Sequence, residues 1–479
     1  MSSPFVISKG IITIPNDFSL MKAKMFLRDC IQLVGETLIV LIPSSFVSST
    51  DLIDYLPVIE SLYSSISEIF MINPLLDVSI YPDWACISGE GFVELKPTTD
   101  YDDSSLVDAS ADSNQPVEKF HKVLIAGTFD HLHCGHKLIL THAIALTQRE
   151  LLVGFTDGDA LLGKKRFKAV MQPISQRVHH VREFLLPLMR NEIELNCIVT
   201  QDHIGPAGSI SFDALAVTSE TRSGGDAVNK FRADAGLSQV KVIELPLIMQ
   251  NAAKFSSTTV REFIVYKSGG FEILSYVEER WNLMANQLSL SVEIRQKWWV
   301  IIAKLYAQTW RKYHTLFHIY ELLSLIGPDD LLQVLTAFFH DAIYRPWRAD
   351  NEDKSVELFE QFCTDSGLKS DSVSANVIEI ILATKAHVKE ISKCNDVVRR
   401  FLELDLGILA SESDRYVTYA NQIKEEYEPY LQENSFNQKR LHFLENLIRY
   451  LEQNSLFADK GLNQKALTNV SNEISRLRV

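Results

Sequence analysis

Between residues 123 and 268, short apolar runs alternate with segments of helical character. Alternation of this kind is typical of a parallel sheet whose strands are joined by crossover helices. The strand-like runs are Val123–Ala126, Leu151–Gly154, Leu215–Val217 and Val240–Leu245. They stop at Ser268, Gly269 and Gly270, and helical patterns rich in Leu, Ile, Phe and Tyr then continue almost to the C-terminus. We therefore predict a multidomain protein in which a Rossmann-like α/β domain precedes an all-α domain.

The first 98 residues mix β-branched runs such as Thr37–Ile42 with helix-like stretches such as Leu52–Phe70. This mixture predicts a small N-terminal α/β unit, whose role the sequence does not indicate. Residues 99–118 are acidic, rich in Ser and Asp and poor in large apolar side chains, which indicates a linker. No internal repeat stands out. The remaining boundaries are expected at 119–268 for the α/β domain, 269–289 for a connector, 290–460 for the helical domain and 461–479 for a tail.

Composition narrows the class of protein. A chain of 479 residues leaves room for several domains. Its formal net charge of -14 argues against a nucleic-acid partner for the whole chain, because DNA and RNA backbones require clustered cations. The six cysteines form no close pair, and the start lacks the apolar core of a signal peptide. We expect a cytoplasmic protein without a membrane partner, and the sequence leaves a homo-oligomer open.

A strand, a loop and a helix start follow one another between Val123 and His136. In open α/β sheets, ligands bind at the carboxyl ends of the strands, where a helix N-terminus also attracts phosphate. Gly127 and Gly135 permit close approach of the backbone to such a ligand. His133 and His136 are three positions apart, so both imidazoles can face the same phosphate if the helix has begun.

The segment GTFDHLHCGH at 127–136 resembles the (T/S)F-D-x-x-H-x-G-H signature of the adenylyl- and cytidylyltransferases. The resemblance implies that the histidines cradle the phosphates of a nucleotide. Thr128 and His136 would hold the α-phosphate region, while His133 would face the β- and γ-phosphates. Phe129 and Asp130 belong to the same nucleotide-binding segment.

Several later segments together resemble the eukaryotic type of phosphopantetheine adenylyltransferase; they are Leu151–Arg166, Met171–Pro173, Arg177–Arg182, Gly205–Gly208 and Val217–Arg232. The resemblance implies transfer of AMP from ATP, with Mg²⁺, to 4'-phosphopantetheine, which gives dephospho-coenzyme A and pyrophosphate. Lys165 would contact the acceptor phosphate, with Lys164 nearly as good a candidate. Arg222 follows a strand-like run and could grip a triphosphate bidentately, or else pair with Glu220 at the surface.

The segment Phe255–Glu262 resembles the serine-threonine motif that precedes the last helix of this family. By that resemblance, Ser256, Ser257 and Thr258 would bind ATP phosphates and Arg261 would supply a cation. A purely structural alternative is an N-terminal capping box, for which Thr259 and Glu262 have the spacing.

In the helical region, His340 and Asp341 are adjacent within an otherwise apolar helix. Burying the two without partners would be costly, so a metal or a hydrogen-bond network is required. With His318 upstream and Asp405 downstream, the array resembles the HD phosphohydrolase superfamily. Tyr313–Ile319, Phe338–Tyr344, Asn351–Ser355 and Leu402–Leu409 look like its predicted small-molecule branch.

This second resemblance implies that His318, His340, Asp341 and Asp405 bind a divalent metal, for which Mg, Mn and Fe remain alternatives. His314 would contact the substrate, a small phosphorylated metabolite, and Glu352 would support the metal ligands or act as an acid or base. The alternative is a silent helical domain that senses nucleotide or mediates oligomerisation. For the α/β domain, cytidylyl transfer is the alternative, against which Gly205–Gly208 and Thr218–Arg232 argue. No GxxxxGK[ST] loop occurs in the chain, which disfavours a kinase of that class.

Overall fold

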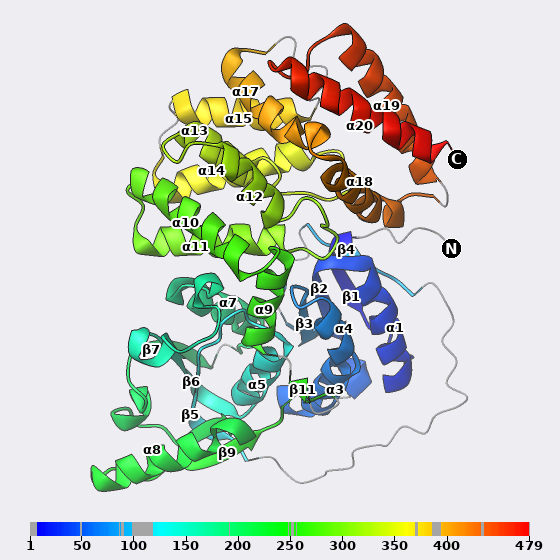
Figure 1. The fold of residues 1–479 in the computed structure, drawn as a ribbon. Coiled ribbons are helices and arrows are strands. Elements are labelled where there is room, and N and C mark those ends of the chain that lie inside the picture. The colour runs from blue at the N-terminus through cyan, green and yellow to red at the C-terminus, as the bar shows by residue number, and fades with distance from the viewer. Residues whose placement is uncertain are drawn as a thin grey trace. The chain divides into compact units, whose positions relative to one another are not determined.

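A computed structural model describes residues 7–47, 50–85, 87, 91–97, 118–190, 192–247, 249–250, 253–254, 256–368, 372–385, 394–432 and 435–478. The chain divides into two compact units, which we call the sheet unit (residues 6–262) and the helical unit (from residue 263). Every strand described lies in the sheet unit (Figure 1). None of the helices in the described ranges combines the length and the apolar character that a membrane crossing requires.

The C-terminal part of the sheet unit contains a five-stranded sheet with the order β7-β6-β5-β8-β9, in which all pairs are parallel. Its strands are β5 (Phe120–Gly127), β6 (Thr147–Thr156), β7 (Glu194–Thr200), β8 (Ala214–Thr218) and β9 (Lys241–Leu245). The helices α5 (Cys134–Ala145), α7 (Ile174–Leu185) and α8 (Arg222–Asp234) connect them. The predicted α/β architecture is therefore confirmed. Because the chain runs outward from β5 to β7 and then crosses to β8, the strand order reverses between β5 and β8.

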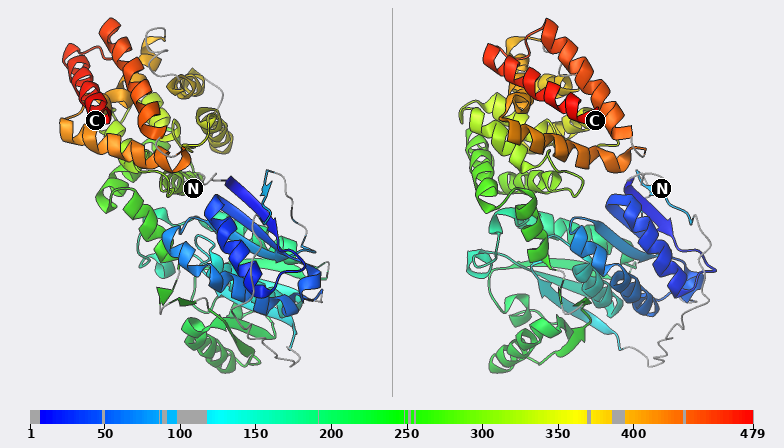
Figure 2. Two further views of the ribbon diagram at one scale, coloured as in Figure 1. Left: turned by 90° about the vertical axis from the view of Figure 1, so that its right-hand side faces the viewer. Right: turned by 45° about the vertical axis from the view of Figure 1, so that its right-hand side comes forward.

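The N-terminal part of the sheet unit has its own four-stranded parallel sheet, with the order β3-β2-β1-β4. Its strands are β1 (Ile7–Thr13), β2 (Val34–Ile42), β3 (Asp77–Pro82) and β4 (Val93–Glu94). Helix α1 (Leu20–Leu33) joins β1 to β2, and α2 (Ser44–Val47), α3 (Leu52–Ser65) and α4 (Ser67–Ile72) lie between β2 and β3. Figure 2 shows this sheet in blue and the five-stranded sheet in cyan to green. The predicted small α/β unit is confirmed.

The two sheets repeat the same topology, although no internal repeat stands out in the sequence. Strands β1, β2, β3 and β4 occupy the same order as β5, β6, β7 and β8. Ile7 pairs with Val34 as Phe120 pairs with Thr147, and both ladders shift register at the next pair. Equal numbers of positions separate Ile7 from Phe120 and Val34 from Thr147. Sequence comparison misses the repeat because a fold constrains burial and register more than it constrains side-chain identity.

The helical unit surrounds an aromatic core. Trp281 is fully buried, and its ring meets that of Phe338 edge to face at a centroid distance of 5.0 Å. The α-helices of the helical unit that follow α9 are α10 (Phe271–Gln287), α11 (Val292–Tyr306), α12 (Leu316–Leu325), α13 (Leu331–Phe339), α14 (Asn351–Ser366), α15 (Ser372–Thr384), α17 (Asp396–Asp405), α18 (Ser413–Tyr427), α19 (Ser435–Gln453) and α20 (Lys460–Leu477). The largely helical C-terminal region agrees with the prediction.

Two expected boundaries differ from the structure. Residues 269–289, expected to be a connector, form α10, which contributes Trp281 to the core. Residues 461–479, expected to be a tail, form most of α20, whose Val470 is buried. Both helices have one polar, exposed face. The sequence alone therefore did not indicate that their other face is buried. Residues 99–117 of the predicted linker lie outside the described residues.

Candidate functional site

A pocket of about 560 Å³ lies at the carboxyl ends of β5 and β8, where the strand order reverses. Ligands bind open α/β sheets at such a switch point, because the loops of neighbouring strands diverge there. The sequence had singled out thirteen residues for this site, and twelve line the pocket: Gly127, Thr128, Phe129, Asp130, His133, Gly135, His136, Lys165, Ser256, Ser257, Thr258 and Arg261.

The two histidines face each other at the start of α5. Their rings stack at a centroid distance of 3.9 Å with an angle of 24° between planes. His133 occupies the N-cap position, and no side chain caps this helix. A Cβ atom on Gly135 would lie 3.2 Å from the His133 ring, so glycine allows the imidazole to fold over the helix start. The arrangement presents two imidazoles and a helix N-terminus to one small volume, which suits a phosphate.

Phe129 closes the base of this loop in a left-handed backbone conformation, with φ of 49°. Its buried ring meets His136 edge to face at 5.4 Å and Phe155 at 5.5 Å. Non-glycine residues rarely adopt this backbone conformation, and those that do are held in it by the surrounding structure. Gly127 is part of that support, because a Cβ atom at this position would lie 3.2 Å from the Phe129 ring.

Arg261 lines the pocket, where it is held in a buried ion pair. It is 2% exposed, and its Nη1 forms an ion pair with the Oδ2 atom of buried Asp130. Its Nη2 donates to Thr258 Oγ1 at 3.0 Å and its Nε to the Arg166 carbonyl at 2.9 Å. Because Asp130 neutralises the guanidinium, Arg261 fixes α9 (Ser257–Lys267) to the loop after β5 rather than supplying an unpaired cation.

Arg177 and Gln172 also hold this loop, and sequence reasoning assigned neither a role. Arg177 Nη1 donates to the carbonyls of Thr128 at 2.8 Å and Thr156 at 2.9 Å, so it joins the ends of β5 and β6. Burial lowers the pKa of Arg177 despite the nearby carboxylate of Asp157. The Gln172 backbone N–H donates to Asp130 Oδ1 at 2.9 Å. A linear sequence cannot distinguish such buried polar residues from surface ones.

The two predicted cations outside the loop have different outcomes. Lys165 lines the pocket, which is compatible with the predicted contact to an acceptor phosphate. Arg222 is absent from the pocket lining, and its side chain is 47% exposed. Its Nε atom lies 3.6 Å from Asp226 Oδ1, one turn along α8. The structure therefore does not bring Arg222 into the candidate site.

The start of α9 combines capping with exposure to the pocket. The Thr259 backbone N–H donates to Ser256 Oγ at 3.4 Å, so Ser256 is the capping residue. The helix begins at Ser257, which places Thr259 inside its first turn, so the alternative box of Thr259 and Glu262 does not form, and Glu262 pairs with Arg166 at 2.6 Å. Ser257 and Thr258 still line the pocket, where their hydroxyls and the helix N-terminus suit an anion.

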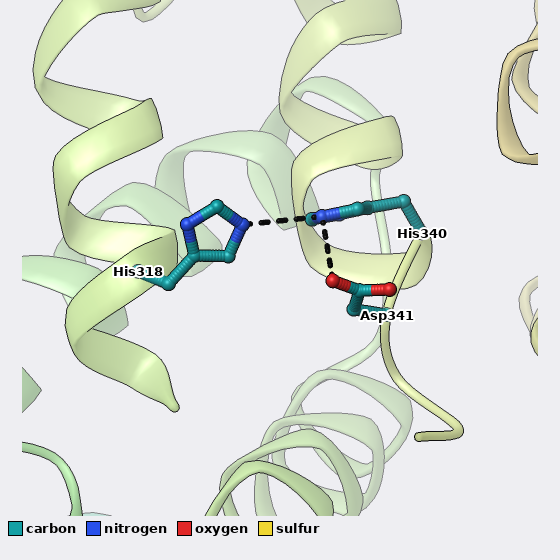
Figure 3. Close-up of side chains that lie close together, drawn as sticks. All are labelled: His318, His340 and Asp341. Atoms are coloured by element: carbon teal, nitrogen blue, oxygen red, sulfur yellow. Dashed lines mark hydrogen bonds and ion pairs between the residues drawn. The ribbon is translucent and has the colours of Figure 1, made fainter. Parts of the chain in front are cut away.

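A second cluster of chemically active side chains lies in the helical unit (Figure 3). His318 on α12 and His340 at the end of α13 approach with 3.3 Å between their Nε2 atoms. Asp341 Oδ2 lies 3.3 Å from His340 Nε2, and Asp405 Oδ1 lies 3.1 Å from His318 Nε2. The four side chains that were predicted as metal ligands thus come together. His318 comes from α12, His340 and Asp341 directly follow α13, and Asp405 is the last residue of α17.

The donor set fits a divalent cation. His318, His340 and Asp341 each offer one atom, and these atoms all lie within 4.8 Å of one another. His340 Nδ1 lies 3.0 Å from the Ala337 carbonyl, which can only accept, so Nδ1 carries the proton. Nε2 is therefore the ring nitrogen that faces the cluster and would bind a metal, while Nδ1 stays hydrogen-bonded as in other metal-binding histidines.

His314 stands beside the cluster and is oriented by Glu426, a residue that the sequence did not reveal. Glu426 Oε2 lies 2.7 Å from His314 Nδ1, while its Oε1 accepts backbone N–H groups of Lys312, Tyr313 and His314. Burial opposes a charge on His314, but Glu426 and Asp341 outweigh it and raise the pKa of this imidazole. Glu352 lies in the first turn of α14, and its role stays a prediction.

The comparisons with known proteins bear on the second sheet of the sheet unit and its surroundings. A family model described as cytidylyltransferase-like matches residues 124–263. The phosphopantetheine adenylyltransferase of Saccharomyces cerevisiae is 32% identical over 154 residues, which are 31% of this chain and 50% of that protein. The phosphopantetheine adenylyltransferase of Pyrococcus abyssi is 32% identical over 149 residues, which are 31% of this chain and 92% of that protein.

A solved structure from Archaeoglobus fulgidus, of a protein with unknown function, is 24% identical and covers 26% of this chain and 99% of its own. Its TM-score of 0.24 is too low to bear on the fold. The chain spans half the length of the Saccharomyces cerevisiae relative but nearly all of the Pyrococcus abyssi relative. Through residues 124–263 it therefore belongs to the cytidylyltransferase-like family of nucleotidyltransferases and is related there to the phosphopantetheine adenylyltransferases.

Proposed function

We propose that the sheet unit transfers the adenylyl group of ATP to 4'-phosphopantetheine, which produces dephospho-coenzyme A and pyrophosphate. The observation that carries this proposal is the convergence of the stacked His133 and His136, Lys165 and the start of α9 on one pocket. The names of the relatives support the choice of acceptor and of ATP as donor. Mg²⁺ is expected to enter with ATP.

The reaction requires alignment rather than a covalent intermediate. An oxygen of the acceptor phosphate attacks the α-phosphorus, the bond from that phosphorus to the bridging oxygen breaks, and pyrophosphate leaves with the electron pair. Holding two anions in line is worth about 7–11 kcal/mol in well-oriented systems, and one well-placed donor adds about 3–4 kcal/mol. His133, His136 and Lys165 would supply donors, while Arg261 and Asp130 keep the two binding segments together.

The direct test is an incubation of the purified protein with ATP, 4'-phosphopantetheine and Mg²⁺, with pyrophosphate and free phosphate followed separately. We expect pyrophosphate in proportion to dephospho-coenzyme A. A parallel reaction with CTP tests cytidylyl transfer, which the description of the matching family keeps open. If turnover with CTP and an alcohol-derived phosphate is faster than turnover with ATP and 4'-phosphopantetheine, the proposed adenylyl transfer is wrong and the domain is a cytidylyltransferase.

For the helical unit we propose metal-dependent hydrolysis of a small phosphorylated metabolite. The supporting observation is the His318, His340, Asp341 and Asp405 cluster, together with the proton that the Ala337 carbonyl fixes on His340 Nδ1. These residues would hold Mg, Mn or Fe, and such a metal polarises phosphate and acidifies bound water. His314, oriented by Glu426, would contact the substrate.

Metal analysis of the intact protein separates this proposal from a silent sensor or oligomerisation module. We expect one bound divalent ion per helical unit in the native chain and none in His340→Ala, whereas His442→Ala on an exposed part of α19 should keep the ion. Phosphate release from phosphopantetheine and related esters tests the substrate class. A native protein that holds no metal and releases no phosphate would support the silent module.

A further inference from the structure

The first sheet, with residues 7–94, has no part in the functions proposed above, yet it repeats the fold of the nucleotidyltransferase domain. Counting from the matched strand residues Ile7 and Phe120, the positions of His133 and His136 are occupied in the first copy by Leu20 and Ala23. Its described residues contain no counterpart of α8 or β9. The first copy therefore keeps the scaffold but lacks the imidazoles that would face a nucleotide.

The first copy contacts the second through its edge strand β3 and helix α3. Tyr81 on β3 donates its hydroxyl to the Phe184 carbonyl on α7 at 3.3 Å, and the two rings lie 5.5 Å apart. At another point of the interface, Lys119 Nζ lies 2.5 Å from Asp51 Oδ2, at the start of α3. The contact region thus extends along the helices that cover one face of the second sheet.

Lys137 is the polar centre of this interface. Its side chain is 3% exposed, and the hydrogen-bond and ion-pair partners of its ammonium group lie on β3, while the ammonium group also lies 5.5 Å from the ring centroid of Phe184 on α7. It pairs with the carboxylate of Asp77, donates to the Val78 carbonyl at 3.0 Å and donates to Ser79 Oγ at 2.7 Å. A buried ammonium requires partners of this kind, so the first copy satisfies a charge that belongs to the second.

The position of Lys137 links this interface to the nucleotide pocket. It immediately follows His136 in the first turns of α5, the helix that carries both histidines. Because a helix moves as a rigid rod over so short a distance, an anchor at Lys137 also fixes the start of α5. The relative from Pyrococcus abyssi is matched over 92% of its length by 149 residues, which leaves no room there for a second α/β copy. The anchor is thus an addition to the common domain.

We infer that the first copy binds no nucleotide and instead acts as a clamp, which positions α5 for adenylyl transfer through Lys137. Lys137 is a positioning residue in this arrangement, since it contacts β3 rather than substrate. The inference depends on the proposed transferase activity for its kinetic consequence, but the docking of α5 on β3 can be measured without any substrate.

The first experiment compares Lys137→Met with Lys24→Met in the full chain. Lys24 is the half-buried lysine at the equivalent position of the first copy. A displacement of about 1 Å can reduce turnover by about 100-fold, so we expect kcat of Lys137→Met to fall by about 10–100-fold with little change in the KM for ATP. Amide hydrogen exchange across residues 134–138 should accelerate in this variant alone. Lys24→Met should match the native protein in both measurements.

The partners of Lys137 provide a second arm. Ser79→Ala should give a smaller loss of kcat than Lys137→Met, and adding it to Lys137→Met should cause no further loss, because both act through one contact. Lys137→Met protein with native kcat would overturn the clamp, even if its melting temperature fell. Unchanged amide exchange in α5 would also overturn it.

Amide hydrogen exchange with and without a non-hydrolysable ATP analogue tests the absence of nucleotide from the first copy. We expect the analogue to protect backbone amides of the second copy from exchange, and protection of residues 7–94 by the analogue would overturn that part of the inference. If the native protein transfers no adenylyl group, the proposed function fails, while the amide exchange of α5 still decides whether the first copy clamps it.

Discussion

His136 contributes an imidazole to the pocket while remaining only partly buried. Replacing it with alanine removes a donor to the nucleotide phosphates and leaves the apolar core nearly intact. We expect His136→Ala to keep a native circular dichroism spectrum and to lose about 10²–10³-fold in kcat for adenylyl transfer. His179→Ala, at an exposed position on α7, is the matched control. Native turnover in His136→Ala would remove the central assignment.

His142, on the same helix, gives a prediction about pH. Burial lowers its pKa from 6.5 to about 4, and its Nε2 atom has no hydrogen-bond partner among the described residues. Below pH 6.5, His142 is protonated in the unfolded chain, whereas in the folded chain it becomes protonated only near pH 4. The free energy of unfolding should therefore decrease by about 3 kcal/mol as pH falls through this window, and be unaffected by His142 above it.

Denaturant titrations of His142→Gln between pH 7 and pH 4 test this assignment. The variant should lose the slope that His142 causes, while His179→Gln should retain the native slope. A native pH dependence in His142→Gln would show that His142 titrates normally in the folded protein.

At the scale of elements, the contact between α9 and the loop after β5 depends on one buried ion pair. Removing one partner leaves the other charge buried, which typically costs about 3–5 kcal/mol. We expect Asp130→Asn to lower the free energy of unfolding of the sheet unit by this amount and to weaken ATP binding, because both binding segments lose their connection. Denaturation followed in the native chain and the variant measures the first effect, and titration with ATP measures the second.

The same helix supplies the control for this prediction. Glu262 pairs with Arg166, and their side chains are 42% and 68% exposed. An exposed pair contributes at most about 1 kcal/mol, so Glu262→Gln should unfold almost as the native protein does. Equal losses in Asp130→Asn and Glu262→Gln would contradict the view that burial gives the Asp130 contact its strength.

At the scale of the whole molecule, the two compact units should respond separately to metal. A ligand that binds only the folded state stabilises it by about 2.7 kcal/mol at one hundred times its Kd. Chelation without substrate should therefore lower the melting transition of the helical unit and leave that of the sheet unit in place. Calorimetry measures both transitions. In His340→Ala, the transition of the helical unit should no longer depend on chelation, and a shift of both transitions in the native chain would contradict separate units.

The sequence alone determined the class of each large part and the residues that bear its chemistry. The spacing of apolar residues along a segment indicates whether it is a strand or a helix and which of its faces is buried. This pattern is local in the sequence, so the parallel sheet and the helical region could be predicted from it. The stretch from Gly127 to His136 was also readable, because strand, loop and helix start follow one another along the chain. Segments with polar faces, such as α10 and α20, were misassigned because the burial of their other face depends on distant partners.

Only the tertiary structure decided how the polar residues are paired. Arg261 was expected to be a phosphate cation and is neutralised by Asp130, while Arg222 lies outside the pocket and Glu426 orients His314. It also revealed the repeated sheet and the anchor at Lys137. The physical reason is the same in each case: the state of a charged side chain depends on which segments meet around it, and residues far apart in the chain, such as Asp130 and Arg261, meet only after folding.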